Sequence, residues 1–438
     1  MDRVSRRVSI STLGCKTNQF ESAAMQERLQ QAGYTIVPFA QAADLVIVNT
    51  CTVTAATDAQ SRNIIRRARR LNPACRVVVT GCYAQVDPDA LAALPEVSLI
   101  LGNEEKHDFL ERLESLSPFS ETVTVDVSDI ETVRSARVPT LISYAERSRA
   151  YIQIQNGCDA YCSYCIIPYA RGHSRSVAVD QVIEQVKRLV AQRFHETVLT
   201  GIHIGAYGLD LSPPDSLLSL LRRIETETDL LRLRLGSIEP NEIHPELIEA
   251  IATSRIICPH LHIPLQSGDS AVLKRMNRHY TGDDFRQLIA AIVAAIPDIS
   301  LGLDLITGFP GETDAEFNNT LALVESLPIS SLHVFPFSKR EGTPAATMPK
   351  QIPQQIARER AALLRALSDQ RQQEYARSFV GKTVEVVVEQ SRQNANQKGM
   401  TRHYLPVSFQ GAGIQAGDLV QLEVERFDAN GLVGRLLD

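Results

Sequence analysis

Short apolar runs alternate with helical patterns along most of this sequence, and that alternation restricts the possible folds more than any other feature. In the N-terminal part the runs are residues 8–12, 44–50 and 76–81, and a segment with helical spacing follows each of them. Apolar runs that are bounded by turns and separated by helices are typical of a parallel sheet. Residues 1–130 are therefore predicted to form a parallel α/β domain.

A cysteine follows each of these three runs. Cys15, Cys51 and Cys82 come just after the carboxyl ends of the predicted strands, which is the edge where parallel α/β sheets bind ligands. We expect the three thiols to meet on one rim of the sheet. The alternative is three independent buried cysteines, which are common singly, but the equivalent positions of all three disfavour it.

A second series of strand–helix units begins near residue 150. The predicted strands are residues 151–155, 196–201, 231–237, 260–265, 300–308 and 331–337. Six such units suggest a partial (β/α)6 barrel of the TIM type, with its chemistry at the C-terminal ends of the strands. Residues 145–375 are assigned to this barrel, and the polar residues 117–148 before it are interpreted as a connector.

The C-terminal part changes in character. Residues 357–379 are predicted to form one long helix, and residues 377–438 contain short strands. Short strands in so small a segment suggest a small all-β barrel of the OB type. The fold class is therefore predicted to be α/β with a small C-terminal β-barrel.

Charge and hydrophobicity limit the surroundings of the protein. The net charge is −6, so nucleic-acid binding would depend on local basic patches. No apolar run approaches the roughly 18 residues of a transmembrane helix, and the first residues lack the apolar stretch of a signal peptide. We therefore expect a cytoplasmic protein that crosses no membrane. Eight cysteines in such a protein favour metal or redox chemistry over disulfides.

Three more cysteines are crowded into one loop. Cys158, Cys162 and Cys165 lie in NGCDAYCSYCIIPYARG. A structural zinc site closes with four N/S ligands, whereas an iron–sulfur cluster held by three thiolates keeps one iron open for a substrate. The nearest histidine, His173, comes eight residues after Cys165 and does not have zinc-finger spacing. The loop therefore favours a three-thiolate cluster over zinc or a redox thiol pair.

These motifs resemble a known family. CDAYCSYC is similar to the CxxxCxxC signature of radical S-adenosylmethionine (SAM) enzymes, including an aromatic residue, Tyr164, before the last cysteine. STLGCKTNQFES, VNTCTVT and VTGCYAQ resemble the N-terminal domain of methylthiotransferases. The match continues through VLTGIHIGAYG, RLGSIEP, HLHIPLQSGDSAVLKRMNRHYT, DLITGFPGET and HVFPFSKREGTPAA. The C-terminal part is similar to the TRAM domain that ends those enzymes.

One short motif points to a branch of the family. LGCKTNQFES looks most like the branch that acts on N6-threonylcarbamoyladenosine in tRNA, the MtaB type. The isopentenyladenosine branch more typically reads YGCQMN, and the branch that modifies a ribosomal protein reads LGCPKN. The resemblance therefore implies a tRNA-modifying enzyme that adds a methylthio group at C2 of this nucleoside, at position 37 beside the anticodon.

The resemblance also implies two 4Fe–4S clusters and SAM as cofactors. Cys158, Cys162 and Cys165 would hold the cluster whose open iron binds the amino and carboxylate groups of SAM, for reductive cleavage to a 5′-deoxyadenosyl radical. The three rim cysteines would hold a second cluster that carries the sulfur of the methylthio group. Soft thiolates suit iron–sulfur clusters and zinc alike, so the residues alone leave the second metal open. Cys75 and Cys258 match neither motif and are interpreted as buried free thiols.

Further SAM contacts are predicted at the ends of the barrel strands. Thr200 and Gly201 occupy the place where the family contacts the SAM amino group, and Tyr164 lies in the cysteine loop. Ser237 and Glu239 could reach ribose hydroxyls through a carboxylate acceptor. Gly308 and Gly311 could allow the backbone to approach adenine. Ordinary turns are the alternative explanation for the glycines.

RNA contacts are predicted from basic and aromatic residues. Those on the helix after Cys51 share one face and could pair with phosphates, although a solvated helix face is an equal alternative. Tyr404 could stack on a base. The full set is Arg62, Arg66, Arg69, Arg70, Lys274, Arg275, Arg278, Lys398, Arg402 and Tyr404.

The predicted function is that of a radical SAM tRNA methylthiotransferase whose partners are tRNA, an electron donor and a sulfur source. Two alternatives keep the chemistry and change the target, to isopentenyladenosine in tRNA or to a ribosomal protein. A third alternative, from a different class, is a zinc-stabilised RNA-binding protein without turnover. It is disfavoured because a pure binder does not require GSIEP and TGFPGET around the cysteine loop.

Overall fold

The computed structural model describes residues 6–115, 122–139, 148–391, 396–429 and 431–437. The chain divides into two compact units, each made of several segments. The first unit comprises Met1–Ser143, Gln155–Val177 and Ser338–Ala346, and the second comprises Tyr144–Ile154, Ala178–Phe337 and Thr347–Asp438. The CxxxCxxC loop thus belongs to the same compact unit as the N-terminal strands.

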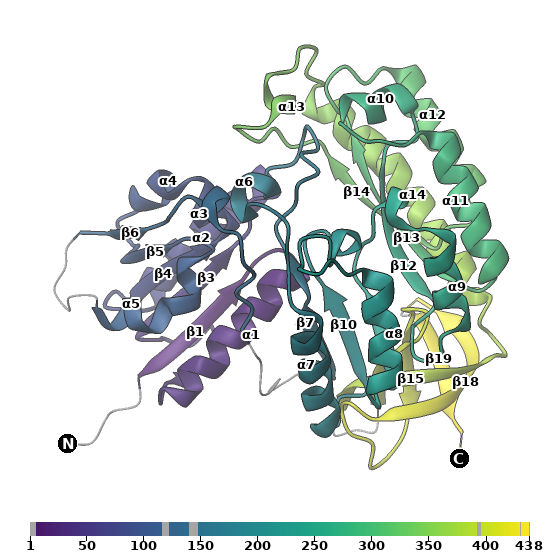
Figure 1. The fold of residues 1–438 in the computed structure, drawn as a ribbon, viewed down its shortest axis with the longest axis horizontal. Helices are drawn as coiled ribbons and strands as arrows, with labels where there is room; N and C mark the ends of the chain where they lie inside the picture. The colour runs from purple at the N-terminus through teal and green to yellow at the C-terminus, as the bar shows by residue number, and fades with distance from the viewer. Residues whose placement is uncertain (1–5, 116–121, 140–147, 392–395, 430, 438) are drawn as a thin grey trace. The chain divides into compact units, whose positions relative to one another are not determined.

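In the described part of the first unit, a six-stranded parallel sheet has the order β2-β1-β3-β4-β5-β6 (Figure 1). The strands are β1 Arg7–Thr12, β2 Thr35–Ile36, β3 Leu45–Thr50, β4 Arg76–Gly81, β5 Leu99–Leu101 and β6 Thr124–Asp126. The central strand β3 is buried along its whole length, as expected for a parallel sheet covered on both faces. The prediction of a parallel α/β fold is confirmed.

One strand of this sheet falls in the segment that was interpreted as a connector. β6 pairs in parallel with β5 at the edge of the sheet. Its three residues, TVD, are half-buried or exposed, so they carry no apolar pattern that could predict a strand. Parts of the predicted connector, residues 116–121 and 140–147, lie outside the described residues.

Helices cover both faces of the sheet. They are α1 Lys16–Gln31, α2 Ala55–Leu71, α3 Cys82–Val86, α4 Pro88–Ala92, the 3-10 turn η1 Glu105–Asp108 and α5 Phe109–Ser115. Val46 and Val48 point to the face that packs on α2, α3 and α4, whereas Leu45 and Ile47 point to the face that packs on α1 and α5. This alternation is the period of two that a strand imposes on its side chains.

The remaining segments of the first unit carry short elements. They are the 3-10 turn η2 Ile130–Thr132, β8 Gln155–Asn156, α6 Ile167–Arg171 and β9 Arg175–Ser176. β8 and β9 pair in an antiparallel ladder. The cysteine loop and α6 lie between β8 and β9, so the ladder holds the two ends of this segment together.

The second unit contains the six predicted strands of the partial barrel. They are β7 Arg149–Gln153, β10 Glu196–Thr200, β11 Arg232–Leu235, β12 His260–Gln266, β13 Ser300–Thr307 and β14 Ser331–Pro336. They form two parallel three-stranded sheets, β11-β10-β7 and β12-β13-β14. Two isolated parallel bridges, Leu233 with Ile257 and Ser237 with His262, join the sheets. The predicted first strand, 151–155, has the expected length but lies two residues earlier, because β7 spans Arg149–Gln153.

Helices follow the barrel strands in turn. They are α7 Val179–Ala191, η3 Ile204–Ala206, α8 Leu217–Glu227, η4 Pro240–Glu242, α9 Pro245–Thr253, α10 Ser270–Arg275, α11 Gly282–Ala295, α12 Asp314–Ser326, α13 Pro344–Thr347 and α14 Gln354–Arg377. α11 and α12 each begin at a capping box, with Thr281 and Thr313 as the N-cap residues. α14 is the predicted long helix, and it packs against β14. None of the described helices is long and apolar enough to cross a membrane.

The C-terminal strands close into a small barrel, drawn in yellow in Figure 1. They are β15 Thr383–Ser391, β16 Asn396–Thr401, β17 Pro406–Gln410, β18 Leu419–Asp428 and β19 Gly431–Leu436, in the order β15-β16-β17-β19-β18. Val386, Val388, Phe409 and Val424 fill its interior, against Phe379. The predicted small all-β barrel is confirmed.

Candidate metal centre

The three rim cysteines follow neighbouring strands of the first unit. Cys15 is the N-cap residue of α1, Cys51 follows β3 directly, and Cys82 is the first residue of α3, directly after β4. β1, β3 and β4 are adjacent in the sheet, so all three cysteines stand at its carboxyl edge. Cys51 and Cys82 are buried and Cys15 is exposed.

The turn before Cys15 comes very close to Cys51. Gly14 has a φ of +90°, and a Cβ atom at this position would lie 2.7 Å from the Cys51 sulfur. A glycine is therefore required both by the backbone conformation and by the close approach. Burial raises the pKa of Cys51 to about 12, and the Cys82 and Cys15 sulfurs nearby add to the rise. A thiolate here needs a cation beside it, which a bound metal would supply.

A buried ion network adjoins these thiols. Arg171 has no exposed surface, and its Nε donates to the Cys82 sulfur at 3.3 Å. Its two terminal nitrogens contact Glu21 and the Oδ1 atom of Asn18. Lys106 Nζ lies 2.7 Å from Glu21 Oε2. Both cations thus share one carboxylate, and the network ends on a sulfur atom.

The groups of this network are mostly charged at neutral pH. Burial would raise the pKa of Glu21, but Arg171 and Lys106 outweigh it and lower that pKa to about 2. Burial lowers the pKa of Lys106 to about 8, which still leaves it mostly protonated at pH 7. Two cations and one anion leave an excess of one positive charge. A metal bound by three thiolates carries negative charge, so these residues fit such a group.

The second cysteine set lies in the loop before α6. Cys162 is buried, and Cys158 and Cys165 are half-buried. The Cys165 amide donates to the Cys162 carbonyl at 2.9 Å, and the Ala160 amide points at the Cys158 sulfur at 3.5 Å. The amide contact helps to fix the position of the Cys158 sulfur. Tyr164 lies in the same loop.

The compact first unit holds both cysteine sets. α3, which begins with Cys82, packs against α6, and Asn103 Nδ2 donates to the Ala170 carbonyl of α6 at 2.6 Å. Because α6 starts two residues after Cys165, these contacts fix the two sets within one rigid packing arrangement.

The segment Ser338–Ala346 adds a second connection between the two sets. Arg340 pairs with Asp58 at 2.7 Å and donates to Thr52, the neighbour of Cys51. Further along, the Ala345 amide donates to the carbonyl of Ser163, between Cys162 and Cys165, at 2.8 Å. The motif SKREGTPAA therefore supports the surroundings of both cysteine sets.

The residues predicted to contact SAM lie at the carboxyl ends of the second unit's strands. Thr200 ends β10 and Gly201 follows it, whereas Ser237 comes shortly after β11. Glu239 accepts a two-pronged ion pair from Arg278. These four positions are consistent with a shared rim, and their contact with SAM stays a prediction.

The two predicted SAM glycines also have structural reasons. Gly308 has a φ of +73°, and a Cβ atom there would lie 2.4 Å from the Cβ of Ala357 in α14. Gly311 has a φ of +76°, and its amide donates to the Lys350 carbonyl at 2.8 Å. Backbone conformation at both sites, and packing at Gly308, already require glycine.

The predicted RNA contacts fall into two groups. Several already have protein partners: Arg62 donates to Tyr83, Arg69 to the Glu96 carbonyl, Arg275 to Glu316, Arg278 to Glu239 and Arg402 to the Ile257 carbonyl, while Tyr404 stacks with His260 and lies under Arg234. Arg66, Arg70, Lys274 and Lys398 are exposed. The exposed group is the better placed for phosphates, and all ten stay predictions.

Another group of possible metal ligands lies in the second unit. His262, Asp304 and His333 stand on the neighbouring strands β12, β13 and β14, with ligand atoms within 4.8 Å of one another. His262 Nε2 is 2.8 Å from Asp304 Oδ1. The two histidines outweigh the effect of burial and hold the pKa of Asp304 below its usual range. The sequence analysis did not select these residues.

The network residues Glu21, Lys106, Arg171 and Arg340 were also missed. Glu21 and Arg340 stand in motifs that were matched to the family, and Arg171 stands in the quoted cysteine loop. Sequence patterns relate neighbours along the chain, however, and Arg171 is 150 residues from Glu21.

Comparisons with known proteins agree with this structure. Residues 7–102 match a family model described as "Uncharacterized protein family UPF0004", and residues 152–324 match the Radical SAM superfamily. The threonylcarbamoyladenosine tRNA methylthiotransferase MtaB of Bacillus subtilis (strain 168) is 39% identical over 422 residues, which cover 95% of this chain and 93% of that protein. The chain belongs to the MtaB family of radical SAM methylthiotransferases.

Further relatives and solved structures are also similar to this chain. MtaB of Thermotoga maritima is 35% identical, over 98% of this chain and 96% of that protein. The tRNA-2-methylthio-N(6)-dimethylallyladenosine synthase of Clostridium novyi (strain NT) is 32% identical, over 99% of this chain and 97% of that protein. Among solved structures, the radical SAM methyltransferase TsrM of Kitasatospora setae shares the fold, with a TM-score of 0.55 and 17% identity over 78% of this chain and 77% of that one.

Membership of the MtaB family confirms the predicted enzyme class. As a radical SAM enzyme, the protein uses SAM and a 4Fe–4S cluster.

Proposed function

We propose that this protein adds a methylthio group to C2 of N6-threonylcarbamoyladenosine at position 37 of tRNA. The observation that carries this proposal is the 39% identity to the threonylcarbamoyladenosine enzyme MtaB over nearly the whole of both chains. The similarity to a dimethylallyladenosine synthase is lower, at 32%. The motif LGCKTNQFES in β1 and α1 agrees with the same substrate.

Cys158, Cys162 and Cys165 are proposed to hold the radical SAM cluster. With three protein ligands, such a cluster keeps one iron open for SAM and supplies the electron for its cleavage. The chain's own part is to position the thiolates: the loop is closed by the β8–β9 ladder and by the Ala345–Ser163 contact. Thr200, Gly201, Ser237, Glu239, Gly308 and Gly311 are proposed to bind SAM at the strand ends, together with Tyr164.

Cys15, Cys51 and Cys82 are proposed to hold a second 4Fe–4S cluster for the sulfur of the methylthio group. Burial of Cys51 and Cys82 would shield two of the three thiolates from water. The excess positive charge of the Arg171 network would compensate the negative charge of a metal–thiolate group. The overall change breaks the C2–H bond and forms a C2–S bond, so that S–CH3 replaces the hydrogen. The hydrogen would leave in 5′-deoxyadenosine, and a further SAM would supply the methyl group. An electron donor for SAM cleavage and a sulfur source are needed as partners.

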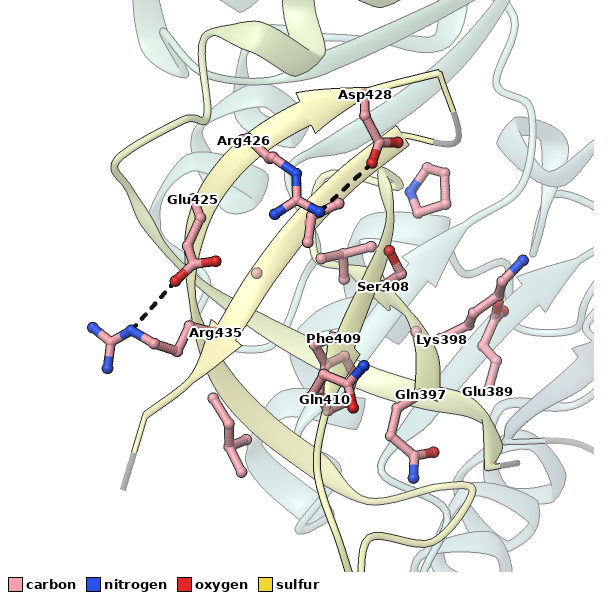
Figure 2. Close-up of a pocket in the computed structure, with 16 residues that line it drawn as sticks. Glu389, Gln397, Lys398, Ser408, Phe409, Gln410, Glu425, Arg426, Asp428 and Arg435 are labelled. Atoms are coloured by element: carbon pink, nitrogen blue, oxygen red, sulfur yellow. Dashed lines mark ion pairs between the residues drawn. The ribbon is translucent and has the colours of Figure 1, made fainter. Parts of the chain in front are cut away.

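Binding of tRNA is proposed to use local cationic positions. One of them, Lys398, lies on a face of the C-terminal barrel that is hollowed by a groove of about 930 Å³ (Figure 2). In this groove Arg426 points to Asp428 and Arg435 to Glu425, with ion pairs at 4.0 and 3.5 Å. Glu389, which also lines the groove, pairs with Arg149. Lys398 is thus the groove cation that we propose for a phosphate contact.

The proposal is tested by mass spectrometry of tRNA nucleosides from cells with and without the gene. The expected result is loss of the 2-methylthio form of N6-threonylcarbamoyladenosine, with accumulation of the unthiolated nucleoside. Loss of the 2-methylthio form of isopentenyladenosine in its place would move the substrate to the other tRNA branch. No change in either nucleoside would contradict a tRNA substrate.

Variants of the two cysteine sets are expected to distinguish SAM cleavage from thiolation. Replacing Cys158, Cys162 or Cys165 with alanine is expected to abolish SAM cleavage, measured as 5′-deoxyadenosine. Cys51→Ala or Cys82→Ala is expected to retain SAM cleavage and to stop thiolation. A folded Cys82→Ala variant that lost both activities would contradict the division between the two sites.

A further inference from the structure

Arg171 is placed as a bridge between the two cysteine sets. It is the last residue of α6, six residues after Cys165, yet its guanidinium contacts residues of α1 and α3 in the N-terminal part of the chain. Its Nε reaches the sulfur of Cys82, and its other nitrogens reach Glu21 and Asn18 of α1. One side chain therefore connects the segment after the CxxxCxxC loop with a thiol of the other set.

The surroundings hold this guanidinium in one orientation. Asn18 is fully buried, and its Nδ2 donates to the carbonyls of Leu13 and Thr50 at 2.8 and 2.9 Å. This fixes its Oδ1 as the acceptor for Arg171. Glu21 takes both terminal nitrogens of Arg171 in a planar, two-pronged geometry that lysine could not provide. The remaining Nε–H then has the Cys82 sulfur as its acceptor.

Such a contact has a defined effect on a metal–thiolate group. Hydrogen bonds and positive charge at the ligand sulfur stabilise the more negative, reduced state and so raise the reduction potential. In a buried site this effect is strong, because little solvent screens it. Two contributions act here: the excess positive charge of the network and the N–H···S hydrogen bond of Arg171.

We propose that Arg171 is a positioning residue that fixes the Cys82 sulfur and raises the reduction potential of the group bound by Cys15, Cys51 and Cys82. This inference rests on the proposed function, in which these cysteines hold a second 4Fe–4S cluster. It assigns to the IIPYARG segment, which follows the radical SAM cysteines, a role at the other metal site.

The chain offers a matched pair of variants. Arg171→Met and Lys106→Met each remove one buried positive charge, and each leaves Glu21 paired with the remaining cation. Only Arg171→Met removes the hydrogen bond to Cys82. Methionine has a similar length and adapts to irregular spaces, so both variants are expected to fold. Any difference between them reports what Arg171 adds at the Cys82 sulfur, which is the hydrogen bond together with the direct approach of its charge.

The test uses the full-length chain in which Cys158, Cys162 and Cys165 are replaced by alanine, reconstituted with iron and sulfide. A potentiometric titration followed by electron paramagnetic resonance gives the midpoint potential. Lys106→Met is expected to lower it through charge alone. Arg171→Met is expected to lower the midpoint potential by about a further 59 mV for a one-electron couple. At the midpoint of Lys106→Met, the ratio of oxidised to reduced cluster in Arg171→Met would then be about ten.

The outcomes separate this inference from the proposed function. A parent variant that binds no iron would contradict the second cluster. A parent that binds iron, with equal midpoints for Arg171→Met and Lys106→Met, would overturn the role of Arg171 and leave the second cluster intact. Arg171→Lys adds a check. It keeps the positive charge and loses the planar, two-pronged geometry of the guanidinium, so its midpoint potential should lie between that of the parent and that of Arg171→Met.

Discussion

Two buried arginine networks, one in each compact unit, contain similar residues but contact different groups. In the first unit Arg171 and Lys106 share Glu21. In the second, Arg232 and Arg234 share Glu196, at 2.7 and 3.0 Å, and none of the three has exposed surface. In each network two fully or almost fully buried cations share one carboxylate, which is costly unless further partners are present. In the second unit Arg149 lies 3.6 Å from Glu196, and Glu385 lies 3.9 Å from Arg232.

The difference lies in those further partners. Arg234 donates to the backbone carbonyls of Thr401 and Arg402 at 3.2 and 3.0 Å, and Arg232 to that of Met400 at 3.2 Å. These carbonyls belong to the C-terminal barrel, so the network joins that barrel to the β10 and β11 strands. The Arg171 network ends instead on the sulfur of Cys82. The Glu196 network connects parts of the protein, whereas the Arg171 network contacts a thiol that we propose as a metal ligand.

The largest effect is expected from Glu196→Gln. Arg232 and Arg234 would lose their shared carboxylate while remaining buried, at a cost of about 3–5 kcal/mol in the free energy of unfolding. Denaturant unfolding followed by circular dichroism measures it. Because the partners of this network are protein groups, the decrease in the free energy of unfolding should be equal with and without reconstituted iron. If bound iron made the decrease in the free energy of unfolding smaller, the Glu196 network would depend on the metal as the Arg171 network is expected to.

Glu21→Gln should have a similar effect that depends on the metal. Without iron, two buried cations lose their carboxylate, and about 3–5 kcal/mol is expected again. With iron bound, the thiolates supply negative charge beside Arg171 and should recover part of this loss. The same unfolding measurement, made before and after reconstitution, gives the difference. Identical losses in the two states would show that the Arg171 network does not face a metal.

A smaller effect is expected from pH. Burial, with Lys106 beside it, lowers the pKa of His107 from 6.5 to about 4. Between these values the unfolded chain binds more protons than the folded chain, so stability is highest above pH 6.5 and falls as the pH falls to 4, by at most about 1.4 kcal/mol per pH unit. His107→Gln should flatten this slope in thermal unfolding. An unchanged slope would exclude His107 as its source.

The smallest effect is expected at the surface of the C-terminal barrel. Arg435, whose side chain is 60% exposed, pairs with Glu423 and Glu425. Exposed ion pairs contribute about 0.2–1 kcal/mol, so Arg435→Ala should lower the free energy of unfolding by no more than that. The measurement calibrates the scale for the buried networks, and a loss as large as that of Glu196→Gln would remove the contrast between exposed and buried pairs.

The fold could be predicted from the sequence because its signals are local. β3 reads LVIVNT and β4 reads RVVVTG, and such apolar runs between helical segments define a parallel sheet without tertiary information. The position of Cys51 and Cys82 at the sheet rim follows from the same pattern. β6 and the break between β7 and β8 could not be predicted, because short or polar strands have no pattern of their own.

The surroundings of the candidate site were beyond sequence reasoning for a different reason. Arg171, Glu21 and Lys106 come from segments far apart in the chain, and charged residues predict a solvated surface far more often than a buried network. The predicted RNA contact Arg278 shows the converse: it reads as a basic surface residue and is buried against Glu239. Burial of charge is a property of the folded chain.

Iron and sulfide analysis of two anaerobically reconstituted variants tests the central claim most directly. One variant lacks Cys158, Cys162 and Cys165, and the other lacks Cys15, Cys51 and Cys82. If each cysteine set holds its own cluster, each variant retains about four irons per chain, the content of one 4Fe–4S cluster, where the unaltered protein has about eight. If the first variant is free of iron, or binds zinc in its place, the rim thiols of the N-terminal sheet do not hold an iron–sulfur cluster.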